Sequence, residues 1–262
     1  MDLRDFEPAR TDRRLSGETA QPPAWRHRVF FACVIVQLAA MSLAWNLLAP
    51  VLGLLLPRAT AGRLGRVGVS FLYRCCWTSA EMLGLMEIDS SELDVLRDEP
   101  GGLIVAANHP TMLDALLVVA RLPRGVCVMK AELTHNIFLG GGARLARYIK
   151  NDVGRGMVRD AVQTLREGNQ LILFPEGTRT VAAPVNAFKP GITLISHLAR
   201  VPIQTVVIES FSPYLTKGWP LLKAPPVPVR IRVRLGKRFE PEADHRAQLR
   251  RLELYFAEEL RQ

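Results

Sequence analysis

A histidine and an aspartate five positions apart are the first residues whose types and spacing could do chemistry. His109 and Asp114 belong to the segment NHPTMLD, residues 108–114, which follows the apolar run LIVAA. Pro110 suits the first turn of a helix, so His109 falls just before that helix. On a continuous helix, residues five apart point about 140° away from each other, whereas a histidine outside the helix can fold back toward the aspartate.

Such a pair has a definite chemical use. A carboxylate bonded to one imidazole nitrogen fixes the tautomer and leaves the other nitrogen free to take a proton. No serine or cysteine stands beside His109 and Asp114 in the segment. The pair therefore suits activation of a hydroxyl that arrives with the substrate, rather than formation of a covalent intermediate. Taken alone, the spacing also fits a buried histidine that lies near an aspartate by chance.

A second segment with chemical side chains is FPEGTR, residues 174–179, at the end of the apolar run LILF. Gly177 permits an unusual backbone turn. Thr178 and Arg179 can then present a hydroxyl and a guanidinium to a phosphate or carboxylate. Glu176 could bind substrate hydroxyls or hold Arg179 in place. Taken alone, these residues fit an ordinary strand-to-loop turn equally well.

Short apolar runs that alternate with helical stretches must position these side chains. The alternation predicts an α/β domain with a largely parallel sheet flanked by helices. Both chemical segments follow predicted strands, and ligand crevices form at the carboxyl ends of strands in open α/β sheets. We therefore expect the two segments to face one cleft.

The predicted elements follow from hydrophobic periodicity. The last predicted strand, VRIRVRL, alternates strictly and is expected to be a half-exposed edge strand. The predicted strands are 103–107, 126–129, 171–175, 203–209 and 229–235. The predicted helices lie near 111–121, 132–147, 155–167, 191–200 and 242–261.

An apolar segment precedes this domain. Residues 29–57 contain no charged side chain, and roughly 20 apolar residues are enough to cross a bilayer core. We predict that this segment is embedded in a membrane, after a loose polar arm over 1–28. Because Pro50 breaks or kinks a helix, the segment either spans once or forms a shallow hairpin bent around Asn46–Pro50, which we favour. A buried helix of a soluble protein is the alternative.

The remaining residues, 58–262, are predicted to form the α/β domain. The stretch 60–88 mixes apolar and aromatic residues with arginines, which predicts a helix in the headgroup plane of a membrane. Tyr73 and Trp77 would then lie at the interface. The same stretch could instead be the first helix that packs on the core, and the sequence does not separate these alternatives.

The balance of charges limits the partners. A net charge of +9 implies attraction to anionic surfaces. The basic residues are scattered among apolar stretches and no nucleic-acid motif accompanies them, so we expect an anionic membrane surface and no nucleic acid. The four cysteines have neither a metal-ligand spacing nor a disulfide framework. We expect no metal and no cofactor.

Together, the two chemical segments resemble a known family. NHPTMLD followed by FPEGTR is similar to the glycerolipid acyltransferases, the lysophosphatidate acyltransferase superfamily. FKPG, residues 188–191, resembles the family's Phe-Lys-x-Gly, and VPI, residues 201–203, resembles its final Val-Pro-Ile block. The resemblance implies that His109 is the general base, that Asp114 orients it, and that Glu176–Arg179 binds the acceptor's head group.

One stretch departs from the family pattern. The family usually has an arginine at the end of a short strand between the two segments, where it helps to hold the acceptor phosphate. The matching stretch here is YIKND, residues 148–152. Lys150 is the nearest cation, a point charge in place of a planar fork. We therefore count Lys150 and Lys189 with Glu176, Gly177, Thr178 and Arg179 as substrate-binding residues, and the acceptor lipid stays open.

The resemblance implies an O-acyltransferase that moves a fatty acyl group from acyl-CoA or acyl carrier protein, as co-substrate, to the hydroxyl of a lysolipid. The favoured acceptor is 1-acylglycerol 3-phosphate, which would give phosphatidate. A non-phosphorus lysolipid or a polyene glycolipid is the alternative acceptor. A thioesterase-like hydrolase or a catalytically dead membrane-surface binding protein would share the scaffold. We expect the cytoplasmic membrane, with the catalytic domain on its cytoplasmic face.

Overall fold

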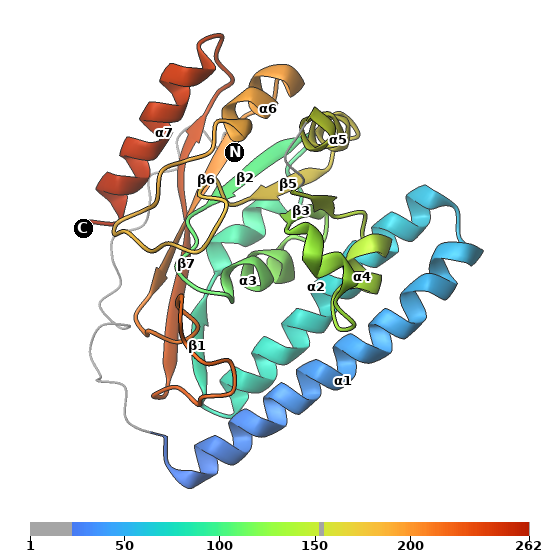
Figure 1. Cartoon of the computed structure of the whole chain (residues 1–262), viewed down its shortest axis with the longest axis vertical. Helices are drawn as coiled ribbons and strands as arrows, with labels where there is room; N and C mark the ends of the chain where they lie inside the picture. The colour runs from blue at the N-terminus through green and yellow to red at the C-terminus, as the bar shows by residue number, and fades with distance from the viewer. Residues whose placement is uncertain (1–22, 152–154, 262) are drawn as a thin grey trace.

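A seven-stranded sheet in the order β1-β7-β6-β2-β5-β3-β4 forms the centre of the molecule (Figure 1). The structure is a computed structural model and describes residues 23–151 and 155–261. Every neighbouring pair of strands is parallel except β6 and β7, so the predicted α/β domain with a largely parallel sheet is confirmed. The strands are β1 (Met86–Asp89), β2 (Leu103–Ala107), β3 (Gly125–Met129), β4 (Ile149–Lys150), β5 (Gln170–Leu173), β6 (Ile203–Ser210) and β7 (Val229–Phe239).

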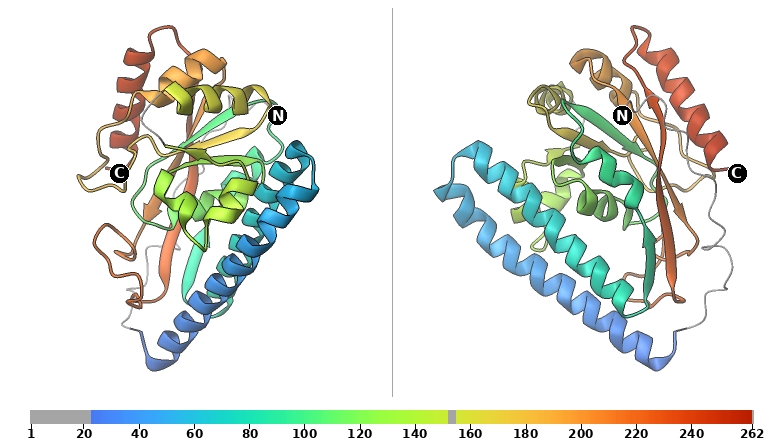
Figure 2. Two further views of the ribbon diagram at one scale, coloured as in Figure 1. Left: turned by 45° about the vertical axis from the view of Figure 1, so that its right-hand side comes forward. Right: turned by 180° about the vertical axis from the view of Figure 1, so that it is seen from behind.

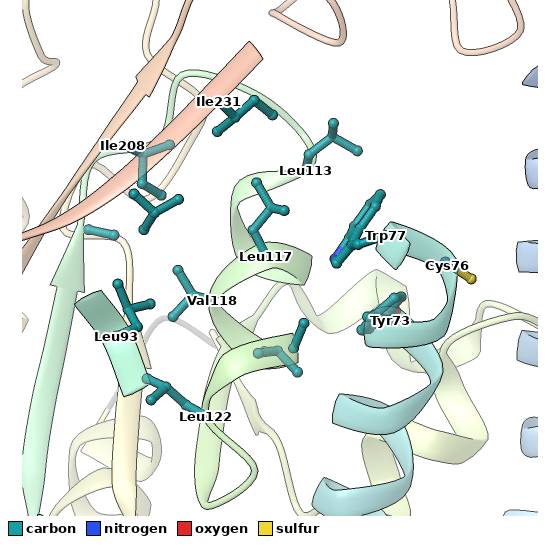
Figure 3. Packing of buried hydrophobic residues seen from close by; sticks show 14 of the residues in the cluster. Tyr73, Cys76, Trp77, Leu93, Leu113, Leu117, Val118, Leu122, Ile208 and Ile231 are labelled. Atoms are coloured by element: carbon teal, nitrogen blue, oxygen red, sulfur yellow. The ribbon is translucent and has the colours of Figure 1, made fainter. Parts of the chain in front are cut away.

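Helices cover both faces of the sheet (Figure 2). Leu103, Val105 and Ala107 of β2 belong to a core shared with α2 and α3, part of which Figure 3 shows. Ile104 and Ala106 point the other way, into a core shared with α5, α6 and α7. A strand buried on both faces has an uninterrupted apolar sequence, which LIVAA has. The helices are α1 (Trp25–Leu55), α2 (Arg58–Met82), α3 (Asp114–Arg121), α4 (Gly140–Leu145), α5 (Arg155–Arg166), α6 (Gly191–Ala199) and α7 (His245–Glu259), with short 3₁₀ helices η3 (Ser91–Leu96) and η4 (Ala131–His135).

The prediction that VRIRVRL forms an edge strand is wrong. β7 lies between β1 and β6, and its Arg230 and Arg232 are buried. Glutamates from neighbouring elements neutralise arginines of this strand: Arg230 binds Glu87 of β1 at 2.7 Å, and Arg234 binds Glu259 of α7 at 2.8 Å. Two of the three arginines that suggested a solvated face therefore form ion pairs with glutamates distant in the sequence.

α1 and α2 form an antiparallel hairpin along one side of the molecule (Figures 1 and 2). The predicted bend around Asn46–Pro50 is wrong, because α1 is one helix that contains Pro50. The chain turns instead at Leu56, which has an extended backbone because the residue before a proline avoids the helical region. Pro57 then immediately precedes α2.

α1 presents one stripe to the rest of the protein. Its buried residues are Val34, Ser42 and Ala49. Among the described residues it is the one helix that is long and apolar enough to cross a membrane. It begins at Trp25, so the last part of the arm expected over 1–28 is helical, whereas residues 1–22 lie outside the described part of the chain.

α2 packs on the α/β core. Tyr73, Cys76 and Trp77 are buried near α3 (Figure 3). Tyr73 and Trp77 therefore do not lie at a membrane interface. The prediction of an interfacial helix over 60–88 is wrong for the face of α2 that carries these two residues. α2 also ends at Met82, and the end of that stretch forms β1. The alternative, a first helix that packs on the core, is confirmed.

Candidate active site

The turn between β2 and α3 brings His109 and Asp114 together. The Nδ1 atom of His109 lies 2.8 Å from Oδ2 of Asp114. Asp114 is the first residue of α3 and is fully buried. Thr111 donates to the same carboxylate twice, from its backbone N–H at 2.7 Å and from its hydroxyl at 2.6 Å. The histidine thus lies outside the helix, as predicted, although the helix begins at Asp114 rather than at residue 111.

The turn is anchored to the neighbouring strand. The side chain of Asn108 donates to the backbone oxygen of Ile208 in β6 at 2.8 Å and accepts from the N–H of the same residue at 2.7 Å. One face of the His109 ring contacts the ring of Phe174, with ring centroids 4.3 Å apart. Contacts on several sides therefore hold the imidazole in one orientation.

The environment of Asp114 decides the state of the histidine ring. Burial raises the pKa of this carboxyl, while hydrogen bonds from His109 and Thr111 oppose that shift. An ionised Asp114 requires its three partners to donate, so the proton of His109 belongs on Nδ1. The Nε2 atom is then the nitrogen available to take a proton from a substrate.

Glu176 joins the two chemical segments. Its buried carboxylate accepts from the backbone N–H of His109 at 2.9 Å and from the N–H of Asn186 at 2.8 Å. The hydroxyl of Thr180 donates to both carboxylate oxygens, at 2.8 and 2.9 Å. The expectations that Glu176 binds substrate hydroxyls or holds Arg179 are therefore not met. Its carboxylate instead holds the two loops together.

The FPEGTR turn directs Arg179 to the loop between β6 and β7. Gly177 has a φ of +69°, a region that glycine adopts without steric cost. The Nη1 atom of Arg179 donates to the backbone oxygens of Leu215 at 3.0 Å and Thr216 at 3.1 Å. A guanidinium has five N–H donors, so further donors remain for an anion.

A cleft of about 390 Å³ gathers most of the predicted site residues. His109, Gly177, Thr178, Arg179 and Lys189 all line it, together with the ends of β3 and β5. It also contains Lys130 and Lys217, which were not among the predicted site residues. Lys130 directly follows β3, so its place at a strand's carboxyl end was a usable signal. Lys217 lies in the β6–β7 loop, and no pattern in the sequence indicates it.

Comparisons with known proteins show what the chain is similar to. Residues 87–209 match the family model described as Acyltransferase. This part of the chain is therefore similar to an acyltransferase domain. The chain is 29% identical over 136 residues to the 1-acyl-sn-glycerol-3-phosphate acyltransferase of Limnanthes alba (49% of this chain, 48% of that protein). It is 31% identical over 124 residues to the alpha form of that enzyme in Homo sapiens (44% and 43%). The chain thus spans about half the length of the curated relatives that it matches.

The fold of the chain also has a solved counterpart. The crystal structure of the 1-acyl-sn-glycerophosphate (LPA) acyltransferase PlsC from Thermotoga maritima superposes with a TM-score of 0.68 at 18% sequence identity. The match covers 90% of this chain and 93% of that one. It therefore includes the N-terminal hairpin as well as the sheet.

Lys150 does not lie in the cleft that contains His109. Along β4, Ile149 is buried and Lys150 faces outward into a separate hollow. Asn151 follows, donates its N–H to the oxygen of Met129 at 2.7 Å, and lines the cleft. Lys150 and Arg179 therefore line different hollows, and the prediction that both bind the same substrate group is wrong. Asp152 lies outside the described residues.

An apolar cavity of about 110 Å³ adjoins the cleft. The two share lining residues from α3, β3 and η4, and the cavity continues between α1, α2 and α4. Trp45 of α1 and Tyr73 of α2 line its inner part. A Cβ on Gly142 would lie 2.7 Å from the Trp45 ring, so this glycine allows the ring to pack against α4. The cavity offers an apolar chain a place beside His109.

We predict that Glu176→Gln destabilises the α/β domain. The amide nitrogen would donate where the carboxylate accepts, which leaves a buried N–H of His109 or Asn186 without an acceptor. Such a loss costs about 1–3 kcal/mol. Chemical denaturation would measure it against Glu240→Gln, because Glu240 is 71% exposed. A free energy of unfolding equal to that of the control variant would contradict the joining role of Glu176.

Proposed function

We propose that this protein is an O-acyltransferase that moves a fatty acyl group from a thioester, acyl-CoA or acyl carrier protein, to the hydroxyl of a membrane lysolipid. The observation that carries the proposal is the His109–Asp114 pair at the cleft, with Nε2 left to accept a proton. The acyltransferase family match over residues 87–209 supports the same reaction class.

The transfer then needs no covalent enzyme intermediate. Nε2 of His109 takes the hydroxyl proton while the hydroxyl oxygen attacks the thioester carbonyl carbon. The tetrahedral intermediate collapses, the carbon–sulfur bond breaks, and the thiolate leaves with the proton that His109 returns. The cleft is also lined by Cys127, but burial raises the pKa of this thiol to about 12. A protonated thiol is a poor nucleophile, so Cys127 does not compete with the acceptor.

The charge of the cleft supports a phosphorylated acceptor. Arg179, Lys130, Lys189 and Lys217 all line it. Cations with free donors bind phosphate through charge-assisted hydrogen bonds. We therefore propose 1-acylglycerol 3-phosphate as acceptor and phosphatidate as product. A non-phosphorus lysolipid or polyene glycolipid would leave these four cations without a phosphate partner.

The hairpin supports a position at the membrane surface. α1 packs on α2 and α4, so it cannot cross a bilayer unless these two helices also enter the bilayer. Its outer face carries exposed leucines, among them Leu47, Leu54 and Leu55. We propose that α1 lies along one leaflet of the cytoplasmic membrane, with the cleft on the cytoplasmic side. Acceptor lipids could then reach His109 without leaving the membrane.

The direct test supplies labelled acyl-CoA or acyl carrier protein to the purified protein in anionic vesicles with lysophosphatidate. We expect labelled phosphatidate with wild type and a rate about 10² to 10⁴ times lower with His109→Ala. His245→Ala, at the start of α7, is the matched control. Release of free fatty acid without an acceptor would indicate a thioesterase instead. A His109→Ala variant that kept a third of wild-type turnover would remove this residue from the mechanism.

The acceptor phosphate is tested by Arg179→Lys. The planar fork becomes a point charge and the bonds to Leu215 and Thr216 are lost, so we expect the KM for lysophosphatidate to rise about tenfold. The KM for a monoacylglycerol, which has no phosphate, should not change. Arg250→Lys, at an exposed position of α7, controls for the substitution itself. Equal effects on both acceptors would show that Arg179 does not recognise phosphate.

The membrane position is tested by Leu47→Asp with Leu54→Asp. These side chains are 69% and 87% exposed, so the melting temperature should stay unchanged. Co-sedimentation with anionic vesicles should fall at least tenfold, since each buried leucine contributes about 1.5–3 kcal/mol. Leu254→Asp, 61% exposed on α7, should bind vesicles like wild type. Undiminished sedimentation of the double variant would exclude α1 as the membrane contact.

A further inference from the structure

A second hollow, of about 660 Å³, lies between the first half of α2, strand β4 and helix α5. Arg66, Arg147 and Lys150 contribute three cations to its lining. We call it the basic hollow, and it is distinct from the cleft that contains His109.

The cations of the basic hollow lack ionic partners among the described residues. Arg66 donates to Asn169 at 3.0 Å and to the oxygen of Ala146 at 3.5 Å, both uncharged acceptors. Its Nε atom is buried and has no hydrogen-bond partner in the described chain, and the same holds for the hydroxyl of Tyr148. Among the described residues both acceptors of Arg66 are neutral, so its guanidinium can still attract an anion in the hollow.

The backbone at Arg147 and the charges around Arg66 also favour a bound anion. Arg147 has a φ of +60°, at a helix end where glycine or asparagine would be less strained. Burial and the neighbouring charges of Arg147 and Arg63 lower the pKa of Arg66, although Tyr148 and Glu167 oppose that shift. The fold therefore keeps like charges close together, an arrangement that a bound anion would stabilise.

The opposite wall carries carboxylates that already have partners. Asp160 of α5 pairs with Arg159 at 3.2 Å, and Glu167 accepts from Gln163 at 3.0 Å. Gln163, Thr164 and Asn169 add uncharged polar groups to the lining. A ligand with several negative charges at one end and a polar, neutral part at the other fits this distribution.

The basic hollow is close to the cleft. Met157 lines both, and Asn151 of the cleft directly follows Lys150. Three strand spacings separate β4 from β2, which ends next to His109, or about 14 Å at the usual spacing between strands. A ligand in the hollow therefore needs a long, flexible arm to place its reactive end at His109.

We propose that the basic hollow binds the 3′-phosphoadenosine diphosphate end of a coenzyme A thioester, whose pantetheine arm passes Asn151 and Met157 into the cleft. The three phosphate groups match Arg66, Arg147 and Lys150, and the polar side chains on α5 face the nucleoside. An acyl carrier protein offers one phosphodiester on a protein surface, which leaves most of these cations without a partner. This inference rests on the proposed function, because it names the acyl donor.

The test is calorimetric titration of the full chain in detergent with coenzyme A, dephospho-coenzyme A and 4′-phosphopantetheine. We expect the tightest binding for coenzyme A, and binding weaker by about tenfold or more for each ligand with fewer phosphates. The double variant Arg147→Gln with Lys150→Gln should lose at least tenfold in Kd for coenzyme A. The same variant should lose less affinity for 4′-phosphopantetheine, which has only one of the three phosphate groups. Arg246→Gln, exposed on α7, removes a charge elsewhere and should change nothing.

Equal binding of all three ligands, or no loss in the double variant, would overturn the proposal. If the double variant does not fold, the single variant Lys150→Gln is titrated in its place. The Lys150 side chain is exposed, so its replacement should not affect folding. Because binding is measured without turnover, a protein that binds coenzyme A in this hollow but transfers no acyl group would contradict the proposed function alone. Turnover with acyl carrier protein only, and no coenzyme A binding, would overturn the hollow's assignment and leave the reaction class standing.

Discussion

The hydrogen bond between the His109 ring and the buried Asp114 carboxylate is the constraint on which the rest of the site depends. A carboxylate removed from water needs donors around it, and the turn at the start of α3 provides them from Thr111 and from the imidazole. The same turn therefore satisfies the buried charge and fixes the ring. Which nitrogen faces the substrate, and which proton can move, both follow from that single arrangement.

Glu176 extends this constraint across the cleft, because its carboxylate connects the His109 backbone to the FPEGTR loop. The loop in turn places Arg179 against the β6–β7 connection, and the N-terminal hairpin closes the apolar cavity beside the cleft. The base, the cations and the apolar cavity thus come from four parts of the chain. The geometry supports a reaction in which an apolar chain, a hydroxyl and an anionic group meet at one point.

Local features of this site were predictable from the sequence, and long-range ones were not. The position of His109 relative to Asp114 follows from one proline within a short turn. The role of Glu176 depends on loops that are adjacent only in the fold, so spacing alone misassigned it. Lys150 was misplaced because the direction of a side chain on a two-residue strand depends on its register with β3. β7 was predicted to be an edge strand because its neighbour β1 is only 4 residues long, too short to recognise from the sequence.

The central claim is that Asp114 holds His109 with the proton on Nδ1 and leaves Nε2 as the base. The most direct measurement is ¹⁵N NMR of histidine-labelled protein at neutral pH, with the His109→Gln variant identifying the signal among the five histidines. The account predicts a protonated Nδ1 and an unprotonated Nε2 in wild type, and a loss of this preference in Asp114→Asn. A proton found on Nε2 of wild-type His109, with Nδ1 accepting from a neutral Asp114, would contradict it.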